Sequence, residues 1–179
     1  MLPTHRRSLL LALLAAPFAA AAQGRHRTIT WDDLMPKGWD PFKDLKGLDP
    51  GAVREGSAGE SELMREMRKV WDNAPTRPEL AGQALRLPGY VVPLDGGGGA
   101  GPVKEFLLVP YFGACIHSPP PPSNQIVHVT LRQGAPLKTM AVVWVSGKLS
   151  IQRENTSMGV SSYAMAADTV EPYKETPAR

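Results

Sequence analysis

Four consecutive prolines at 119–122 constrain the fold of this chain more than any other feature. Proline has no backbone N–H and a fixed φ angle, so this stretch cannot join a hydrogen-bonded β-ladder. Apolar sequence typical of strands lies on both sides, at 106–109 and 126–129. We therefore predict a stiff loop between two buried strands, a setting that presents side chains in a fixed geometry.

From residue 85 onward the sequence changes to a period of two and to β-branched residues, which is typical of β-strands. Gly89 and Gly147 lie inside the predicted strands, where glycine often marks a bulge or a barrel bend. A mainly β protein with some α structure is expected, in which residues 85–173 form a small antiparallel β-barrel of the oligonucleotide/oligosaccharide-binding (OB) type. The five predicted strands are 85–94, 103–111, 125–131, 141–151 and 161–170.

Residues 57–84 combine a predicted amphipathic helix with a linker. Ser57-Ala58-Gly59-Glu60 has the pattern of a capping box, and apolar residues follow at helical spacing. The helix is expected to span 60–72, to end before Pro75, and to pack against the barrel through Met64, Met67 and Trp71. Residues 23–56 are predicted to form an irregular N-terminal arm pinned by apolar anchors, and residues 174–179 a short tail. The anchors are Trp31, Leu34, Trp39 and Phe42.

The first 22 residues have the pattern of a signal peptide. His5-Arg6-Arg7 precede a short apolar run, and Ala20-Ala21-Ala22 fits a cleavage site, so the exported chain would start near Gln23. The run is short for a bilayer span, so we expect a periplasmic protein with no transmembrane segment in the mature chain. Losing Arg6 and Arg7 from 20 basic residues leaves 18 against 17 acidic ones. This near-neutral balance does not favour nucleic acid as a partner.

The sequence contains five blocks that form recognisable motifs: 30–36, 87–94, 106–117 with the prolines and Asn124-Gln125, 145–149 and 163–165. These motifs resemble those of a family of exported bacterial proteins, domain of unknown function 3299. His128 departs from the family pattern, in which an aromatic residue is more familiar. The resemblance implies a periplasmic protein with an OB-like β domain. It also implies an accessory role linked to transporters of the macrolide-exporter type and to zinc-regulated gene sets.

Cys115 is the single cysteine of the chain, so it cannot form an internal disulfide. His117 follows two residues later, and in extended backbone two such side chains point to the same side. A thiolate and an imidazole together suit zinc or copper, and His128 on the next strand is the third candidate ligand. The sequence thus predicts a metal site at Cys115, His117 and His128.

Three other interpretations of this loop stay open. Cys115 and His117 are also the pair that a thiol-dependent enzyme needs. Alternatively, the cysteine simply fills space, as buried thiols often do. The loop is also a candidate partner-binding segment, because a polyproline stretch docks well into aromatic grooves. We predict an exported accessory or binding protein rather than an enzyme, acting in zinc or copper homeostasis or with envelope transporter components. The candidate partner-binding residues are Pro119, Pro120, Pro121, Pro122, Asn124 and Gln125.

Overall fold

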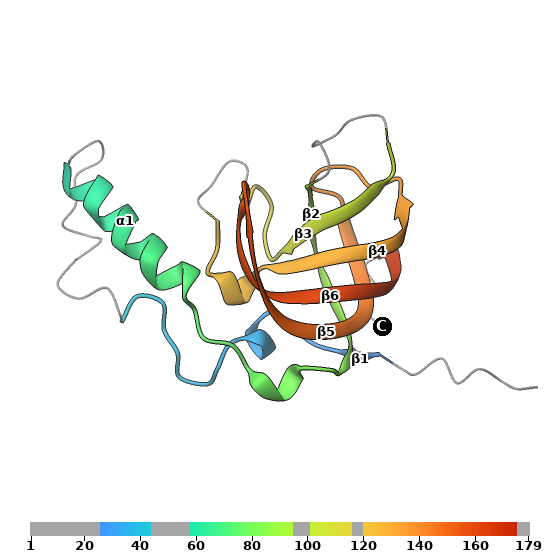
Figure 1. The fold of residues 1–179 in the computed structure, drawn as a ribbon, viewed down its shortest axis with the longest axis horizontal. Helices are drawn as coiled ribbons and strands as arrows, with labels where there is room; N and C mark the ends of the chain where they lie inside the picture. The colour runs from blue at the N-terminus through green and yellow to red at the C-terminus, as the bar shows by residue number, and fades with distance from the viewer. Residues whose placement is uncertain (1–25, 44–57, 95–100, 116–119, 175–179) are drawn as a thin grey trace, which may run out of the picture.

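The computed structural model describes residues 26–43, 58–94, 101–115 and 120–174 (Figure 1). Within these ranges, the N-terminal part contains a short strand, a helix and two 3-10 turns, and five longer strands follow. No helix within the described ranges is both long and apolar enough to cross a bilayer. The elements are β1 (Arg27–Thr28), η1 (Asp32–Leu34), α1 (Ala58–Asp72), η3 (Pro78–Leu80), β2 (Ala84–Pro93), β3 (Val103–Val109), η4 (Ser123–Gln125), β4 (Val127–Ala135), β5 (Val142–Thr156) and β6 (Gly159–Pro172).

The five long strands close into a barrel. β2, β3 and β4 pair antiparallel in sequence order, and β4 then pairs with β6 in parallel. β6 pairs antiparallel with β5, which returns to β2 and completes the ring. This is the arrangement of the OB fold: β2, β3 and β4 form a meander, β4 and β6 form one parallel pair, and β5 closes the barrel on β2. The predicted OB-like barrel is therefore confirmed, and β1 is a short addition to it that the sequence pattern did not predict.

The alternation of side chains along each strand fills the barrel interior. Phe106 lies opposite Val129 and Leu108 opposite Val127. All four belong to the cluster of buried apolar side chains inside the barrel, which we call the main core. The intervening residues, such as Leu107, face the outside of the barrel. A strand period of two thus produces an inner and an outer face from one sequence.

Gly147 lies at a bulge in β5, as the sequence predicted. The register of the β5–β6 pair shifts between Ser146 and Gly147. A Cβ atom added to Gly147 would lie 2.3 Å from the carbonyl oxygen of Ala166, so no other residue fits without a backbone shift. A bulge of this kind bends its strand, and such bends help a sheet to close into a barrel.

The segment that contains β1 and η1 covers one end of the barrel. Ile29 and Leu34 are buried in the main core, and the indole N–H of Trp31 donates to the Pro88 carbonyl at 2.8 Å. The backbone N–H of Ile29 donates to the Arg86 carbonyl at 3.0 Å. The predicted anchoring by Trp31 and Leu34 is confirmed.

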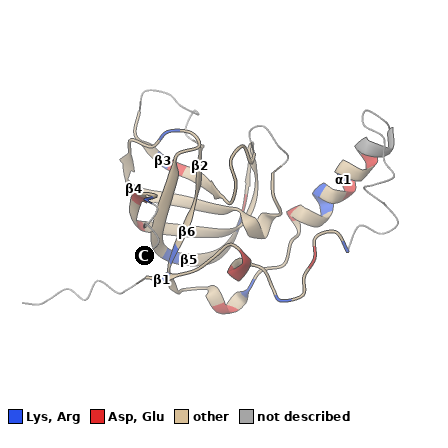
Figure 2. Ribbon diagram, turned by 180° about the vertical axis from the view of Figure 1, so that it is seen from behind, with Lys and Arg blue, Asp and Glu red and all other residues tan. Residues whose placement is uncertain are grey.

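The predicted helix is present as α1, but it projects from one side of the barrel (Figure 1). Met64 is 41% exposed, so the expected packing through this residue is wrong. The C-terminal end of α1 is the part that is held. Trp71 meets the Phe42 ring edge-on at a centroid distance of 6.2 Å, and the Arg153 guanidinium donates to the Asp72 carbonyl. Figure 2 shows that acidic and basic residues alternate along the helix, which keeps much of its surface in solvent.

Candidate functional site

The loop between β3 and β4 re-enters the barrel through η4, and two side-chain amides fix this point. The Asn124 Nδ2 donates to the Pro75 carbonyl at 2.9 Å, and the Gln125 Nε2 donates to the Trp31 carbonyl at 3.0 Å. Both side chains are buried, because each satisfies a backbone acceptor of a segment far away in the sequence. They are occupied inside the protein, so the partner-binding prediction has no support at these two positions.

The proline run packs partly against the protein itself. Pro121 is buried, whereas Pro120 and Pro122 are half-buried; Pro119 lies outside the described residues. Gly159, at the turn between β5 and β6, has φ +149°, and a Cβ atom there would lie 3.1 Å from the Cβ of Pro120. The β5–β6 turn thus supports the end of the loop, and Pro120, Pro121 and Pro122 are not a freely exposed binding segment.

Beneath this loop lies a second apolar cluster on the outer face of the barrel. Val92 lies opposite Leu107, so the two side chains lie on the same face of the sheet. Since Leu107 faces the outside of the barrel, both do, and the loop covers them. Partly buried Tyr90, Leu94, Cys115, Met140 and Met158 surround the cluster. The cluster itself consists of five buried residues, which we call the outer cluster: Val92, Leu107, Val109, Ala114 and Ile126.

Cys115 is half-buried at the margin of the outer cluster and has a left-handed backbone with φ +66°. Non-glycine residues rarely adopt this conformation, so the surrounding packing must hold it. Burial raises the pKa of the Cys115 thiol to about 11, and the positive charge of Arg68 on α1 opposes only part of that shift. The thiol is therefore protonated at neutral pH, which makes it a weak nucleophile.

The same turn exposes two adjacent aromatic rings. Tyr111 is 43% exposed and Phe112 is 66% exposed, and the Phe112 ring meets Tyr90 edge-on at a centroid distance of 6.0 Å. The Gly113 N–H donates to the Met140 sulfur at 3.3 Å, which holds the turn against the barrel. Sequence reasoning gave these two aromatics no role beyond the family motif that contains them. Their position just before a glycine in a loop was the only signal of exposure.

The three predicted metal ligands are placed only in part. His117 lies outside the described residues. His128 lies on β4, and its Nε2 is 3.8 Å from a carboxylate oxygen of Glu105. His128 pairs with Leu107 and so faces the same outer side as the cluster on which Cys115 packs. Among the described residues, no group of three or more His, Cys, Asp and Glu side chains is arranged to hold a metal ion. The predicted metal site therefore depends on His117.

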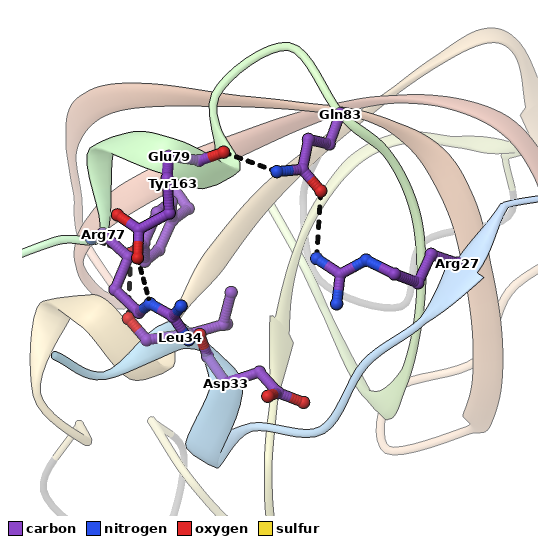
Figure 3. A network of polar contacts seen from close by, with 7 residues as sticks. All are labelled: Arg27, Asp33, Leu34, Arg77, Glu79, Gln83 and Tyr163. Carbon is purple, nitrogen blue, oxygen red and sulfur yellow. Dashed lines mark hydrogen bonds and ion pairs between the residues drawn. The ribbon is translucent and has the colours of Figure 1, made fainter. Parts of the chain in front are cut away.

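A separate polar network lies at the covered end of the barrel (Figure 3). The Tyr163 hydroxyl donates to the Leu34 carbonyl at 2.8 Å and accepts from the Arg77 backbone N–H at 2.7 Å. The Arg77 guanidinium donates to the Asp33 carbonyl and pairs with Glu79, both at 2.8 Å. Most of these bonds end on backbone atoms, so the network holds chain segments together rather than forming a reactive site.

We call the segment between β3 and β4, which contains Cys115, the cysteine loop. The fold and this loop together define a class of protein: a small OB-type barrel with one α-helix in the described ranges, in which the cysteine loop covers part of the outer face of the barrel. The profile of the family described as protein of unknown function (DUF3299) matches residues 31–172. The chain belongs to this family, as the sequence motifs predicted.

Two solved structures resemble this chain to different degrees. A DUF3299 family protein from Pseudomonas aeruginosa PAO1 is 36% identical, with a TM-score of 0.66, over 86% of this chain and 99% of that one. A protein described as an aspartyl-tRNA synthetase from Leishmania major Friedlin is 13% identical, with a TM-score of 0.37, over 56% of this chain and 19% of that one. This second likeness is too weak to carry an argument. A comparison with curated proteins found no match.

Proposed function

We propose that this protein is an exported, non-enzymatic accessory protein that binds a protein partner in the cell envelope. The observation that supports this proposal is the pair of exposed rings, Tyr111 and Phe112, in the turn that follows β3. Aromatic side chains supply much of the binding energy of protein interfaces, and Tyr is among the most enriched residues there. We call Tyr111 and Phe112 the aromatic tip.

The base of the loop is ordered before any partner arrives. Ala114, two residues after Phe112, is buried in the outer cluster, and amide hydrogen bonds join η4 to two other segments. Residues that are already held in place lose little conformational entropy on binding, so more of the contact energy becomes affinity. This arrangement supports binding by the aromatic tip.

The chemistry of Cys115 favours binding over catalysis. A thiol nucleophile needs a lowered pKa or an adjacent base, whereas burial raises the pKa of Cys115 to about 11. Its left-handed backbone and its contacts with the outer cluster favour a structural role in shaping the turn. The thiol-enzyme alternative is correspondingly weaker.

The partner we propose is a component of an envelope transporter, in line with the resemblance of the sequence motifs. A photo-reactive benzoylphenylalanine placed at position 112 in cells should give one discrete adduct with such a component. The matched control is position 151, since Ile151 is also an exposed apolar residue but lies on β5. No adduct from position 112, or the same adduct from both positions, would contradict the proposal.

The proposed export has a direct test. The first 25 residues lie outside the described structure. N-terminal sequencing of the protein from a periplasmic fraction should give a start near Gln23. Intact Met1 on the soluble periplasmic form would exclude cleavage at this site.

Metal binding is a second candidate function, because Cys115 and His128 both border the outer cluster. A metal ion such as zinc or copper would have to displace the thiol proton, so binding should weaken as pH falls. Zinc titration should give one site that is lost in Cys115→Ser and weakened in His117→Ala. His26→Ala is the matched control, because His26 pairs with Asp168 elsewhere on the molecule. Equal zinc uptake by the wild type and Cys115→Ser would exclude the site.

A further inference from the structure

A shallow groove on the outside of the barrel has no role in the function proposed above. It has a volume of about 440 Å³ and is lined by residues of β2, β5 and the end of β6. Arg86 comes from β2, Trp144 from β5 and Glu171 from β6; Tyr173 and Lys174 directly follow β6. It shares no lining residue with the aromatic tip or with the predicted metal ligands.

Planar groups are stacked in this groove. The Arg86 guanidinium lies 4.2 Å from the centre of the Trp144 ring, and the Tyr173 ring lies 5.5 Å from it at an interplanar angle of 25°. Tyr173 is 41% exposed, so part of its ring remains available to a ligand. The face of an aromatic ring is electron-rich and attracts the polarised C–H groups of a sugar ring. The groove thus offers an aromatic platform.

Beside this platform lie a donor and an acceptor of hydrogen bonds. The Arg86 Nη2 is 3.4 Å from a carboxylate oxygen of Glu171, which lies opposite Trp144 in the β5–β6 pair. A sugar hydroxyl both donates and accepts, so neighbouring hydroxyls match such a pair. The guanidinium is already held by stacking and by Glu171, so little side-chain entropy remains to be lost.

We propose that this groove binds an oligosaccharide chain. The open, shallow shape suits one stretch of a longer glycan better than a small molecule that must be enclosed. Glu171 disfavours the phosphates of a nucleic acid, because its carboxylate would lie close to them. Lys174 adds a positive charge at the margin, so a glycan with acidic groups should bind at least as well as a neutral one.

Two defined glycans test the proposal on the purified protein: the hexamer of N-acetylglucosamine and the hexamer of galacturonic acid. Binding is measured by isothermal titration and by the change in tryptophan fluorescence. At least one hexamer should bind, and Tyr173→Ala should weaken it about tenfold through lost stacking. Tyr173→Phe is the matched control, since it keeps the ring and should bind within a factor of about three of the wild type.

Trp144→Ala should also weaken binding, and thermal unfolding shows whether this variant is folded. If it is not, Tyr173→Ala decides, because Tyr173 lies beyond the last strand. The proposal is overturned if neither hexamer binds, or if Tyr173→Ala binds as well as the wild type. A twelve-residue oligothymidylate that binds in place of the glycans would identify the groove as a nucleic-acid site and would also overturn it.

Discussion

The Trp31–Leu34 segment and the cysteine loop both contain aromatic residues, but they differ in whether their apolar side chains are buried or exposed. Leu34 is completely buried, and its carbonyl accepts the Tyr163 hydroxyl. In the loop, by contrast, Tyr111 and Phe112 point into solvent above a buried base. The first motif closes the barrel, whereas the second presents side chains.

This difference separates residues that hold the fold from residues that are free to act. At the covered end, Trp31 and Tyr163 each satisfy a backbone carbonyl, so their polar atoms are already used. In the cysteine loop, Gly113, Ala114 and η4 make the hydrogen bonds and apolar contacts that hold the segment, whereas the rings of the aromatic tip are exposed. Mutations in the two regions should therefore affect stability and binding in opposite proportion.

Leu34→Ala should have the largest effect on stability. It removes a completely buried side chain from the main core and leaves a cavity, which costs about 2–5 kcal/mol. Urea unfolding monitored by tryptophan fluorescence measures the loss. A change below the detection limit would mean that the N-terminal segment does not close the barrel, and the contrast between the two regions would fail.

Tyr163→Phe should have the next largest effect. It removes the hydroxyl that bridges the Leu34 carbonyl and the Arg77 N–H, so one buried and one partly buried backbone group lose their partner. The free energy of unfolding should fall by about 1–3 kcal/mol. Ser150→Ala is the control, because that hydroxyl makes a single long bond of 3.3 Å at an exposed position. Equal losses in both variants would mean that the polar network has no special role.

Cys115 should be alkylated slowly in the folded protein. With its pKa raised from 9.0 to about 11, the thiolate fraction at pH 7.5 is roughly a hundredfold below that of an ordinary thiol. The pKa of the Cys115 thiol is higher in the folded than in the unfolded protein. The contribution of this thiol to the free energy of unfolding is therefore complete below pH 9 and is lost as the pH rises toward 11. Iodoacetamide labelling, with the urea-unfolded protein as control, measures the rate. Fast labelling at neutral pH would restore the thiol-enzyme interpretation.

Phe112→Ala should have the smallest effect on stability. The ring is mostly in solvent, so the free energy of unfolding should change by less than about 0.5 kcal/mol. The same substitution should abolish the partner adduct expected at the aromatic tip when the photo-reactive residue is placed at position 111. Unfolding in urea and crosslinking in cells are measured on the same variant. A large stability loss with an unchanged adduct would reverse the comparison.

The sequence by itself determined the strands, the bulge at Gly147 and the family. All three follow from local properties: the alternation of side chains, the absence of a Cβ atom and the identity of short motifs. The long β5–β6 hairpin extended beyond the predicted limits, because Glu154 and Asn155 pair across it although their polarity is typical of a turn. Pairing can override local propensity in this way.

Tertiary structure alone decided which side chains around the cysteine loop are free. The sequence pattern made Asn124 and Gln125 candidates for partner binding and gave Tyr111 and Phe112 no role of their own, whereas the amides are buried and the rings exposed. It also could not bring Arg86, Trp144 and Tyr173 together, because these residues meet only when β5 closes the barrel on β2. Exposure and the meeting of distant residues depend on long-range contacts, which a local sequence pattern does not contain.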